Sequence, residues 1–281
     1  MEARFFFIVL CALPCILVYI IGLWRRKAGQ AAFAAARHAP TKNEREYYCR
    51  LSVMAGHRKA CRMYSLMHSE YFEDRLPLQP YRSKGVTVTF SGYYYPARYS
   101  ELLDDEQRRF CEELYKFKNG ESDGRDFFRK CLASLKTEEK PYHIMFMPCS
   151  SHEKYISRFE HLDRYITSNY PNLTSGFRDI EISGCRESLH KSKGCKNRKL
   201  SRNYRITGNI SGKEIIIIDD VLTTGQSLKD YKREIEDKGA KVAAALFFGK
   251  TIEMPPVPTV RIYVWGCQIW ELFKKGTRPQ Q

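Results

Sequence analysis

Paired cysteines are missing from this chain. Its ten cysteines are scattered over 281 residues, and no two of them stand in Cys-x-x-Cys spacing, which zinc ribbons and redox dithiols use. They also form no dense framework of the kind that stabilises small secreted domains. These absences argue against a zinc ribbon and a disulfide scaffold, and they fit thiols that are kept reduced inside a cell.

Acidic residues are outnumbered by basic ones. The chain has 32 Asp and Glu against 47 Lys and Arg, a net charge of +15, and residues 178–205 hold nine Lys or Arg with only three acids. Three partners suit such a charge, namely anionic lipid, nucleic acid and a phosphorylated small molecule. Nucleic acid is the weaker expectation, because Tyr204 is the only aromatic residue in the basic segment and base stacking needs more.

Charged residues are absent from residues 5–23, FFFIVLCALPCILVYIIGL, and Trp24 closes this run just before Arg25-Arg26-Lys27. Because about 20 apolar residues span a ~30 Å hydrocarbon layer, the run predicts one transmembrane helix. The basic flank predicts a single-pass protein with the bulk of the chain in the cytoplasm. The alternative is a cleaved signal peptide, but the run is longer than the usual core of about 7–15 residues, and the basic triplet separates it from any cleavage site.

The chain also lacks a Walker A loop. The nearest run, GNISGKE at residues 208–214, is one residue short, ends in Glu and precedes a predicted strand instead of following one. An NTPase needs that loop to hold phosphates. The apolar run with two aspartates at residues 215–220 is therefore not the Walker B strand of an NTPase.

Strands and helices alternate from residue 85 onward. Continuous apolar strands with helices between them predict an α/β fold whose mainly parallel sheet is covered on both faces. Before that point, an alanine-rich linker and an amphipathic helical stalk are expected. The predicted domains are the anchor, residues 1–27, the linker and stalk, residues 28–84, and the α/β domain, residues 85–281. The predicted strands are 86–90, 143–148, 177–182, 214–219, 241–248 and 260–265, and the predicted helices are 100–118, 125–135, 155–170 and 227–238.

Two adjacent aspartates end the most apolar run, since residues 215–227 have the sequence IIIIDDVLTTGQS. Ligands bind beyond the carboxyl ends of the strands in an open parallel sheet, where Asp219 and Asp220 are expected. Backbone N–H groups at the following turn and helix N-terminus predict a phosphate cradle, and Gly225 permits close approach. Carboxylates beside a cradle suit a sugar phosphate, whose ribose hydroxyls they bind directly or through hydrated Mg²⁺. Further hydroxyl donors are Thr223, Thr224 and Ser227.

One plainer interpretation remains open for these residues. The acids and threonines can serve only as a helix N-cap and turn, which an isolated Asp-x-x-Thr would favour. Cys149 and His152 invite a pairing of nucleophile and base, although two residues that stand three apart on a loop rarely act covalently. Ligand binding is what separates the first alternative from a sugar-phosphate site.

The thirteen residues from Ile215 to Ser227 resemble the phosphoribosyl pyrophosphate (PRPP) signature of type I phosphoribosyltransferases. The form DDVLTTGQSL is especially similar to the ComF family of competence-associated, phosphoribosyltransferase-like proteins. The likeness covers roughly residues 85–250 and implies a type I phosphoribosyltransferase fold, here with an N-terminal transmembrane helix and a helical stalk. Three further segments carry it: LYKFKNGES at 114–122, FMPCSSHEKYISRF at 146–159, and Arg186 with the pair Arg198 and Asn203.

The resemblance implies a role for each site residue. Asp219 and Asp220 would be the catalytic acids that hold the ribose, with Mg²⁺ held indirectly. The 5′-phosphate would bind at Val221, Leu222, Thr223, Thr224, Gly225, Gln226 and Ser227. The pyrophosphate loop would comprise Cys149, Ser150, Ser151, His152 and Lys154. A cover loop would include Arg186, Arg198 and Arg202.

The chain departs from the ComF pattern in two places. An anchor and stalk stand where that family usually has a four-cysteine zinc ribbon. The loop after the strand, which is arginine-rich in ComF proteins, has positive charge here only at Lys154 and Arg158. Weaker stabilisation of pyrophosphate would lower transferase activity and leave 5′-phosphate binding intact.

We therefore expect a membrane-anchored, cytoplasm-facing protein that binds PRPP with Mg²⁺. The resemblance implies transfer of the phosphoribosyl group to a nitrogen nucleophile with release of pyrophosphate. The alternative is a non-catalytic protein that senses PRPP or a nucleotide, or that assists DNA handling at the membrane. The sequence does not determine the acceptor base, the pathway or the oligomeric state.

Overall fold

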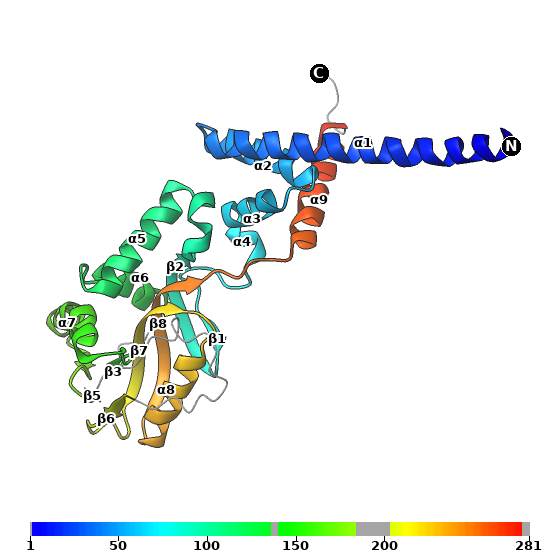
Figure 1. The fold of residues 1–281 in the computed structure, drawn as a ribbon. Coiled ribbons are helices and arrows are strands. Elements are labelled where there is room, and N and C mark those ends of the chain that lie inside the picture. Colours follow the sequence, from blue (N-terminus) through cyan, green and yellow to red (C-terminus); the bar gives the residue numbers. More distant parts are fainter. Residues whose placement is uncertain (1, 136–139, 184–202, 277–281) are drawn as a thin grey trace. The chain divides into compact units, whose positions relative to one another are not determined.

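The structure is a computed structural model that describes residues 2–135, 140–183 and 203–276 (Figure 1). Side chains of residues 2–14, 272 and 274–276 lie outside that description. The chain forms two compact units. Unit 1 comprises residues 1–74, 98–104 and 253–281, and unit 2 comprises residues 75–97 and 105–252. The boundaries predicted after residues 27 and 84 stay predictions.

Unit 1 is helical. The hydroxyl of Thr41 accepts the N–H of Glu44 over 3.2 Å and so caps the start of α2, as Thr does at N-termini. The hydroxyl of Ser52 donates to the carbonyl of Gly29 over 2.7 Å and holds α2 against α1. Helices fill most of the predicted linker and stalk. The elements are α1 (Glu2–His38), α2 (Lys42–Met54), α3 (Arg58–Met67), α4 (Ser69–Phe72), most of a 3₁₀ helix (Ala97–Leu102) and α9 (Val257–Gly276).

The predicted membrane segment lies within α1. Over the part of the chain that the structure describes, no helix combines the length and the apolar character needed to cross a membrane. Residues 5–14 of the predicted span belong to the stretch whose side chains are outside the description.

Unit 2 contains a six-stranded sheet with the order β1-β2-β8-β7-β3-β4. All neighbouring strands pair in parallel except β1 and β2, so the predicted mainly parallel α/β sheet is confirmed. A separate antiparallel pair is formed by β5 and β6. The strands are β1 (Tyr81–Ser83), β2 (Val86–Tyr94), β3 (Tyr142–Phe146), β4 (Leu173–Ser175), β5 (Ile180–Ile182), β6 (Tyr204–Ile206), β7 (Glu214–Leu222) and β8 (Lys241–Thr251).

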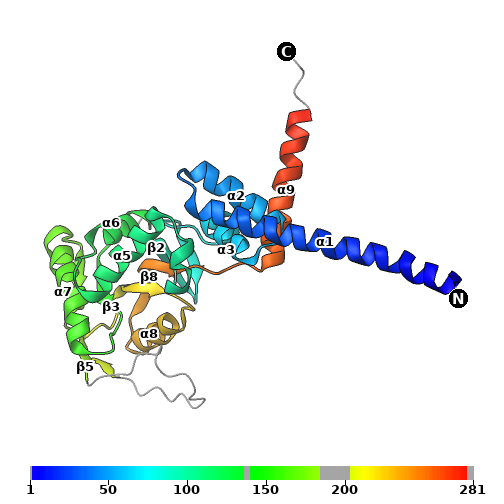
Figure 2. The same ribbon diagram turned by 45° about the horizontal axis from the view of Figure 1, so that its top comes forward.

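Helices lie on both faces of this sheet. Figure 2 shows α5 and α6 on one side and α8 on the other. Residues 215–218 of β7 are fully buried, as expected for a central strand with both faces covered. Tyr231 of α8 also donates its hydroxyl hydrogen to the carbonyl of Phe146 over 3.2 Å, which fixes α8 against β3. These helices are α5 (Asp105–Asn119), α6 (Arg125–Ser134), α7 (His152–Asn169) and α8 (Gln226–Asp237).

Two predicted strands were wrong in whole or in part. Residues 260–265 lie inside helix α9, where Val260 and Val264, one turn apart, are buried. The β-branched and aromatic composition favoured a strand. The segment is helical instead, and the helix buries both valines on one face. Of residues 177–182, only Ile180–Ile182 is a strand, because a turn closed by the N–H of Asp179 and the carbonyl of Gly176 precedes it.

Candidate functional site

The carboxyl ends of β3 and β7 bring two predicted loops together. Phe146 and Ile218 are partners in the parallel register, and the N–H of Met147 donates to the carbonyl of Ile218 over 2.9 Å. Residues 147–151 therefore leave the sheet directly beside Asp219. The predicted ribose acids and the predicted pyrophosphate loop share one edge of the sheet, which is the edge where such sheets bind ligands.

The two acids have different surroundings. Oδ1 of Asp219 accepts the N–H of Asp220, and Oδ1 of Asp220 accepts the N–H of Val221, each over 2.8 Å. Oδ2 of the buried Asp220 lies 3.0 Å from Nη1 of Arg158 and 3.7 Å from Nζ of Lys118. Among the described residues, Asp219 has no ion-pair partner. Asp220 thus forms ion pairs with two cationic side chains of the protein. Asp219 remains available to a ligand.

The protonation of this pair follows from burial and mutual repulsion. Burial, and then the neighbouring Asp220 carboxylate, raise the pKa of Asp219 well above its usual range, against the opposing charge of Arg158. Burial lowers the pKa of Arg158, but Asp220, Cys149 and Asp219 together outweigh it and the net shift is upward. Two carboxyls in contact release their protons in coupled steps. Asp219 therefore holds a proton more readily than an isolated aspartate does.

Arg158 and Lys118 were not among the predicted site residues. Arg158 belongs to α7 and Lys118 to α5, and Nε of Arg158 also donates to the carbonyl of Lys118 over 3.2 Å. Both lie in segments that carry the ComF resemblance, Lys118 in KFKNG and Arg158 in the segment that ends in RF. The resemblance marked these residues, but only the fold shows that they meet at Asp220.

The predicted phosphate turn joins β7 to α8. Gly225 adopts φ +72° and precedes the first residue of α8, Gln226. This left-handed conformation favours glycine. The hydroxyl of Thr224 accepts the N–H of Gln226 over 3.4 Å, and the hydroxyls of Thr223 and Thr251 lie 3.3 Å apart. Thr223, Thr224, Gln226 and Ser227 are exposed. The turn thus presents hydroxyls and the first N–H groups of a helix to solvent.

Lys84 lies beside this turn and was not predicted. It occupies the turn between β1 and β2, and its Cγ and Cε atoms would each lie 3.5 Å from a Cβ placed on Gly225. The residue is exposed. A flexible ammonium group next to a phosphate cradle adds a point charge for an anion. No sequence signal links Lys84 to Gly225, because the contact depends on how the hairpin meets α8.

The predicted pyrophosphate loop is ordered mainly by backbone contacts. Nδ2 of Asn203 donates to the carbonyls of Cys149 and Ser150 over 3.1 and 3.2 Å. The hydroxyl of Ser151 accepts the N–H of Lys154 over 3.4 Å and caps α7, which begins at His152. Burial raises the pKa of Cys149 to about 12. The thiol is therefore protonated near neutral pH, which argues against a nucleophilic role.

The predicted cover loop is not placed by the structure. Arg186, Arg198 and Arg202 all lie in residues 184–202, outside the described residues. Asn203, the last residue of the pattern that suggested this loop, is described and is buried against the pyrophosphate loop.

A magnesium ion is implied by the resemblance, and the residues limit how it can be held. Within residues 2–135, 140–183 and 203–276, no group of three or more His, Cys, Asp or Glu side chains could hold a metal ion. Asp219 and Asp220 are two adjacent carboxylates, one of which already pairs with Arg158. This donor set fits Mg²⁺ that keeps most of its water and takes other oxygens from the ligand, as Mg²⁺ does with phosphates.

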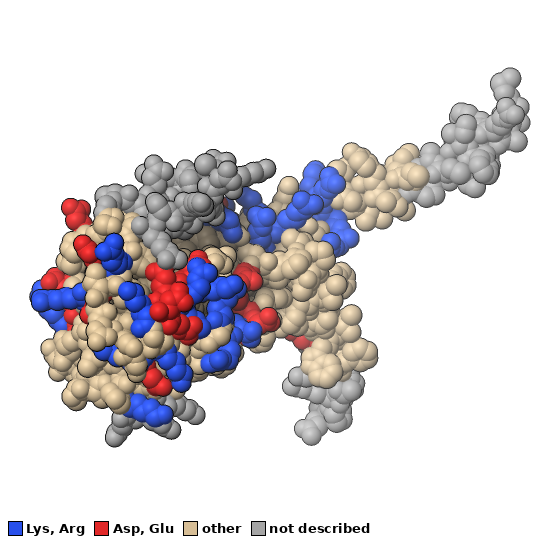
Figure 3. Space-filling model, turned by 90° about the horizontal axis from the view of Figure 1, so that it is seen from below, with Lys and Arg blue, Asp and Glu red and all other residues tan. Residues whose placement is uncertain are grey.

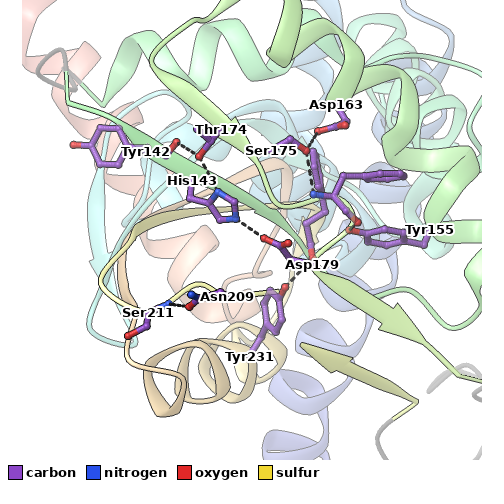
Figure 4. Close-up of polar contacts among 12 residues, drawn as sticks. Tyr142, His143, Tyr155, Asp163, Thr174, Ser175, Asp179, Asn209, Ser211 and Tyr231 are labelled. Carbon is purple, nitrogen blue, oxygen red and sulfur yellow. Dashed lines mark hydrogen bonds and ion pairs between the residues drawn. The ribbon is translucent and has the colours of Figure 1, made fainter. Parts of the chain in front are cut away.

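A second polar cluster lies at the opposite, amino end of the strands. The buried ring of His143 lies between Thr174 and Asp179, with 2.8 Å from Nδ1 to the Thr174 hydroxyl and 2.7 Å from Nε2 to Oδ2 of Asp179 (Figure 4). Burial lowers the pKa of His143, and the hydrogen bond to Asp179 only partly opposes it. A cavity of about 400 Å³ adjoins the ring, and its lining includes Lys140 and Lys213. The cluster ties β3 to β4 and to the residues that precede β5.

The comparisons with known proteins agree with the predicted family resemblance. The phosphoribosyl transferase domain family matches residues 174–281, which is less than half of the chain. The chain is also similar to competence protein ComFC of Streptococcus pneumoniae, with 28% identity over 135 residues that cover 45% of this chain and 56% of that relative. The chain spans little more than half the length of that relative.

The family match includes β7, the phosphate turn, α8 and β8, which together carry Asp219, Asp220 and Gly225. The similarity to ComFC supports the kinship that the DDVLTTGQSL segment predicted. The chain therefore contains a phosphoribosyltransferase domain and is a distant homologue of ComFC.

Proposed function

We propose that this protein binds PRPP at the carboxyl edge of its sheet and transfers the phosphoribosyl group to a nitrogen nucleophile, with release of pyrophosphate. The observation that carries the proposal is the position of Asp219 and Asp220 at the end of β7, one turn before the N-terminus of α8. A ribose 5-phosphate needs both features, acids for its hydroxyls and N–H donors for its phosphate.

Each group of the site has a proposed task. Asp219 accepts hydrogen bonds from the ribose hydroxyls, and Arg158 with Lys118 holds the Asp220 carboxylate in position. The N–H groups after Gly225 hold the 5′-phosphate, and Lys84 adds positive charge beside it. Residues 149–154 lie where pyrophosphate would leave. Mg²⁺, held through water, supplies charge neutralisation for the developing pyrophosphate.

A non-catalytic role in sensing PRPP or a nucleotide is the second candidate. It is favoured by the internal ion pair of Asp220 and by the single lysine in residues 149–154. Such a site would retain the sugar phosphate but stabilise the leaving group weakly. An accessory role in DNA handling rests only on the kinship with a competence protein and is the weaker form of this candidate.

We also propose that α1 anchors the chain and leaves unit 2 in the cytoplasm. The uncharged run of residues 5–23 and the basic triplet after it support this placement. Protease accessibility of unit 2 in oriented membrane vesicles tests it. Digestion only from the cytoplasmic face agrees with the proposal, and digestion from the opposite face contradicts it.

Calorimetric titration of the full chain with PRPP and Mg²⁺, and with inorganic phosphate, tests the site. Asp219→Asn should weaken PRPP binding more than phosphate binding, because only the sugar presents hydroxyls to this acid. Gly225→Ala should weaken both ligands, because φ +72° strains alanine and distorts the cradle. Gly212→Ala is the matched control, since Gly212 has the same φ and an added Cβ meets no atom within 4 Å.

The same titrations separate the proposal from its alternatives. Lys84→Met should weaken both ligands without changing the preference between them. Release of pyrophosphate with a nitrogenous base distinguishes the transferase from the sensor. Absence of PRPP binding by the wild-type chain, or equal effects of the Gly225 and Gly212 variants, would remove the sugar-phosphate site.

A further inference from the structure

Helix α9 carries large apolar side chains that are exposed along one face. Spacings of three or four residues place them on one side of the helix. Val260 and Val264 are buried on the opposite side, and the ring of Tyr263 packs edge-on against Phe72 with 5.2 Å between centroids. The helix is therefore apolar on both faces. The exposed members are Ile262 (73% exposed), Trp265 (43%), Ile269 (49%), Trp270 (62%) and Phe273 (67%), which we call the outer stripe.

The charged groups of α9 leave the outer stripe free of acids. Glu271 is the single acidic residue of the helix, and its Oε1 pairs with Nη2 of Arg50 on α2 over 2.9 Å. The sequence continues after the stripe with Lys274 and Lys275. A helix that is apolar on its outer side and basic at its end suits an anionic lipid surface.

The start of α9 lies near the basic flank of α1. Nη2 of Arg25 donates to the carbonyl of Met54 over 2.8 Å, at the end of α2. Nη2 of Arg261 would lie 4.0 Å from a Cβ on Gly56, two residues further along the chain. Both guanidinium groups therefore border the turn between α2 and α3. Ile262, the first residue of the outer stripe, follows Arg261 directly.

On α1, the change from apolar to basic side chains occurs at Arg25, which borders that turn. Residues 16–21, 23 and 24 of α1 are large, apolar and exposed, and Arg25, Arg26 and Lys27 follow them. Figure 3 shows this order along the protruding α1, where tan side chains are followed by a group of blue ones, and α9 is also mostly tan. In both ribbon views α9 runs across the direction of α1 and not alongside it (Figures 1 and 2).

We propose that α9 lies in the headgroup layer of the membrane that α1 enters, with the outer stripe among the lipid chains. This inference rests on the proposed anchoring by α1 and adds a second, lateral contact. Trp and Phe next to aliphatic residues are the side chains typical of that layer. A second copy of the chain is a poorer occupant, because two copies that each carry a net charge of +15 repel one another.

Tryptophan fluorescence in the full chain tests the proposal. The chain has three tryptophans, Trp24, Trp265 and Trp270. One variant keeps only Trp24 (W265F/W270F), and another keeps only Trp265 (W24F/W270F). Each is reconstituted into vesicles of phosphatidylcholine and phosphatidylglycerol, with and without brominated phosphatidylcholine as a quencher. We expect Trp265 to lose about half of its emission, as for a ring ~5–10 Å into the headgroup and acyl boundary.

A charge on the stripe provides the specific variant. Ile269→Lys in the Trp265-only chain should sharply reduce quenching, and it should still fold because Ile269 is half exposed. Tyr47→Lys adds the same charge at an exposed position of α2 (59%) and should leave quenching unchanged. These two results together support the interfacial position of α9.

Three outcomes would overturn it. If Trp24 is quenched and Trp265 is not, α1 anchors the chain while α9 stays in water. If Trp265 is shielded but unquenched, and light scattering in detergent gives a dimer mass, a second copy covers the stripe. If neither tryptophan is quenched, the anchoring fails together with this inference. The first outcome separates the two proposals.

Discussion

Arg158 is the residue that ties the candidate site to the core of unit 2. Its guanidinium contacts the Asp220 carboxylate at 3.0 Å and the carbonyl of Lys118 at 3.2 Å, and its side chain is only 10% exposed. A buried charge is tolerated when its partner is present and is costly when the partner is removed. The acid of the site and the packing of α5 against α7 therefore depend on one side chain.

We predict that Arg158→Met lowers the free energy of unfolding by about 3 kcal/mol, because Asp220 would keep a buried and poorly compensated charge. Urea denaturation measures it. The control is Arg164→Met on the same helix, whose exposed pair with Glu160 at 2.8 Å should contribute less than about 0.5 kcal/mol. Similar losses for both variants would mean that the ion pair between Arg158 and Asp220 does not stabilise the fold.

His143 gives the stability of the protein a dependence on pH. Its pKa is lowered in the folded state by burial, so below the ordinary value of about 6.5 the unfolded chain binds the proton more readily. The contribution of His143 to stability should therefore be complete above that value and decline as the pH falls below it. Asp163, whose pKa is raised by burial, acts in the opposite direction at lower pH.

We predict that His143→Gln flattens the loss of stability between neutral and mildly acidic pH. Denaturation curves at both pH values measure the slope. His161→Gln is the control, since His161 is exposed on α7 and should leave the slope of the wild type in place. An unchanged slope for His143→Gln would show that another group accounts for the acid sensitivity.

The elements position the site through two junctions, α5 with α7 and β7 with α8. Gly120 ends α5 with φ +81°, and a Cβ there would overlap the carbonyl oxygen of Ser157 on α7. That close approach brings Lys118 and Arg158 within reach of the same carboxylate. The second junction places a helix N-terminus directly after the acids, with Gly225 in the left-handed conformation.

We predict that Gly120→Ala costs more stability than Gly85→Ala. Both glycines have positive φ, +81° and +77°, but an added Cβ at Gly85 would meet only Cε of Lys232 at 3.9 Å. The Gly85 variant should lose about 1 kcal/mol for the backbone alone, and the Gly120 variant should lose this amount plus the steric cost. Thermal unfolding checks the order. Equal losses would mean that α7 moves away from the added Cβ without a measurable loss of stability.

At the scale of the whole molecule, the chain passes between two units, and residues 98–104 of unit 1 interrupt unit 2 only briefly. The six-stranded sheet, the helices against it and every described site residue belong to unit 2. A sheet with helices on both faces can bury its own core. Unit 1 contributes helices, and two of them, α1 and α9, carry exposed apolar side chains.

We predict that a fragment of residues 75–252 folds cooperatively and keeps the binding of PRPP and phosphate that the full chain has. Circular dichroism during urea denaturation, together with the same calorimetric titrations, measures both properties. A fragment that folds but no longer binds would assign part of the site to unit 1. A fragment without a cooperative transition would show that unit 2 needs the helices of unit 1.

The sequence alone determined the features that depend on contiguous residues. The four isoleucines before Asp219 predicted a buried strand, because a strand covered on both faces is apolar throughout. The turn chemistry from Thr223 to Ser227 predicted a phosphate-binding turn at the start of a helix, and the structure has that helix from Gln226. The alternation of strands and helices predicted the mainly parallel sheet.

Tertiary structure decided which distant residues meet. Lys118, Arg158 and Asp220 lie on three elements, and no local pattern shows that one carboxylate takes both cations. Lys84 reaches Gly225 only through the placement of the β1–β2 turn. The segment 260–265 is helix and not strand, and this helix buries Val260 and Val264, which lie one turn apart. Local sequence fixes propensity, whereas burial and charge pairing depend on packing between elements.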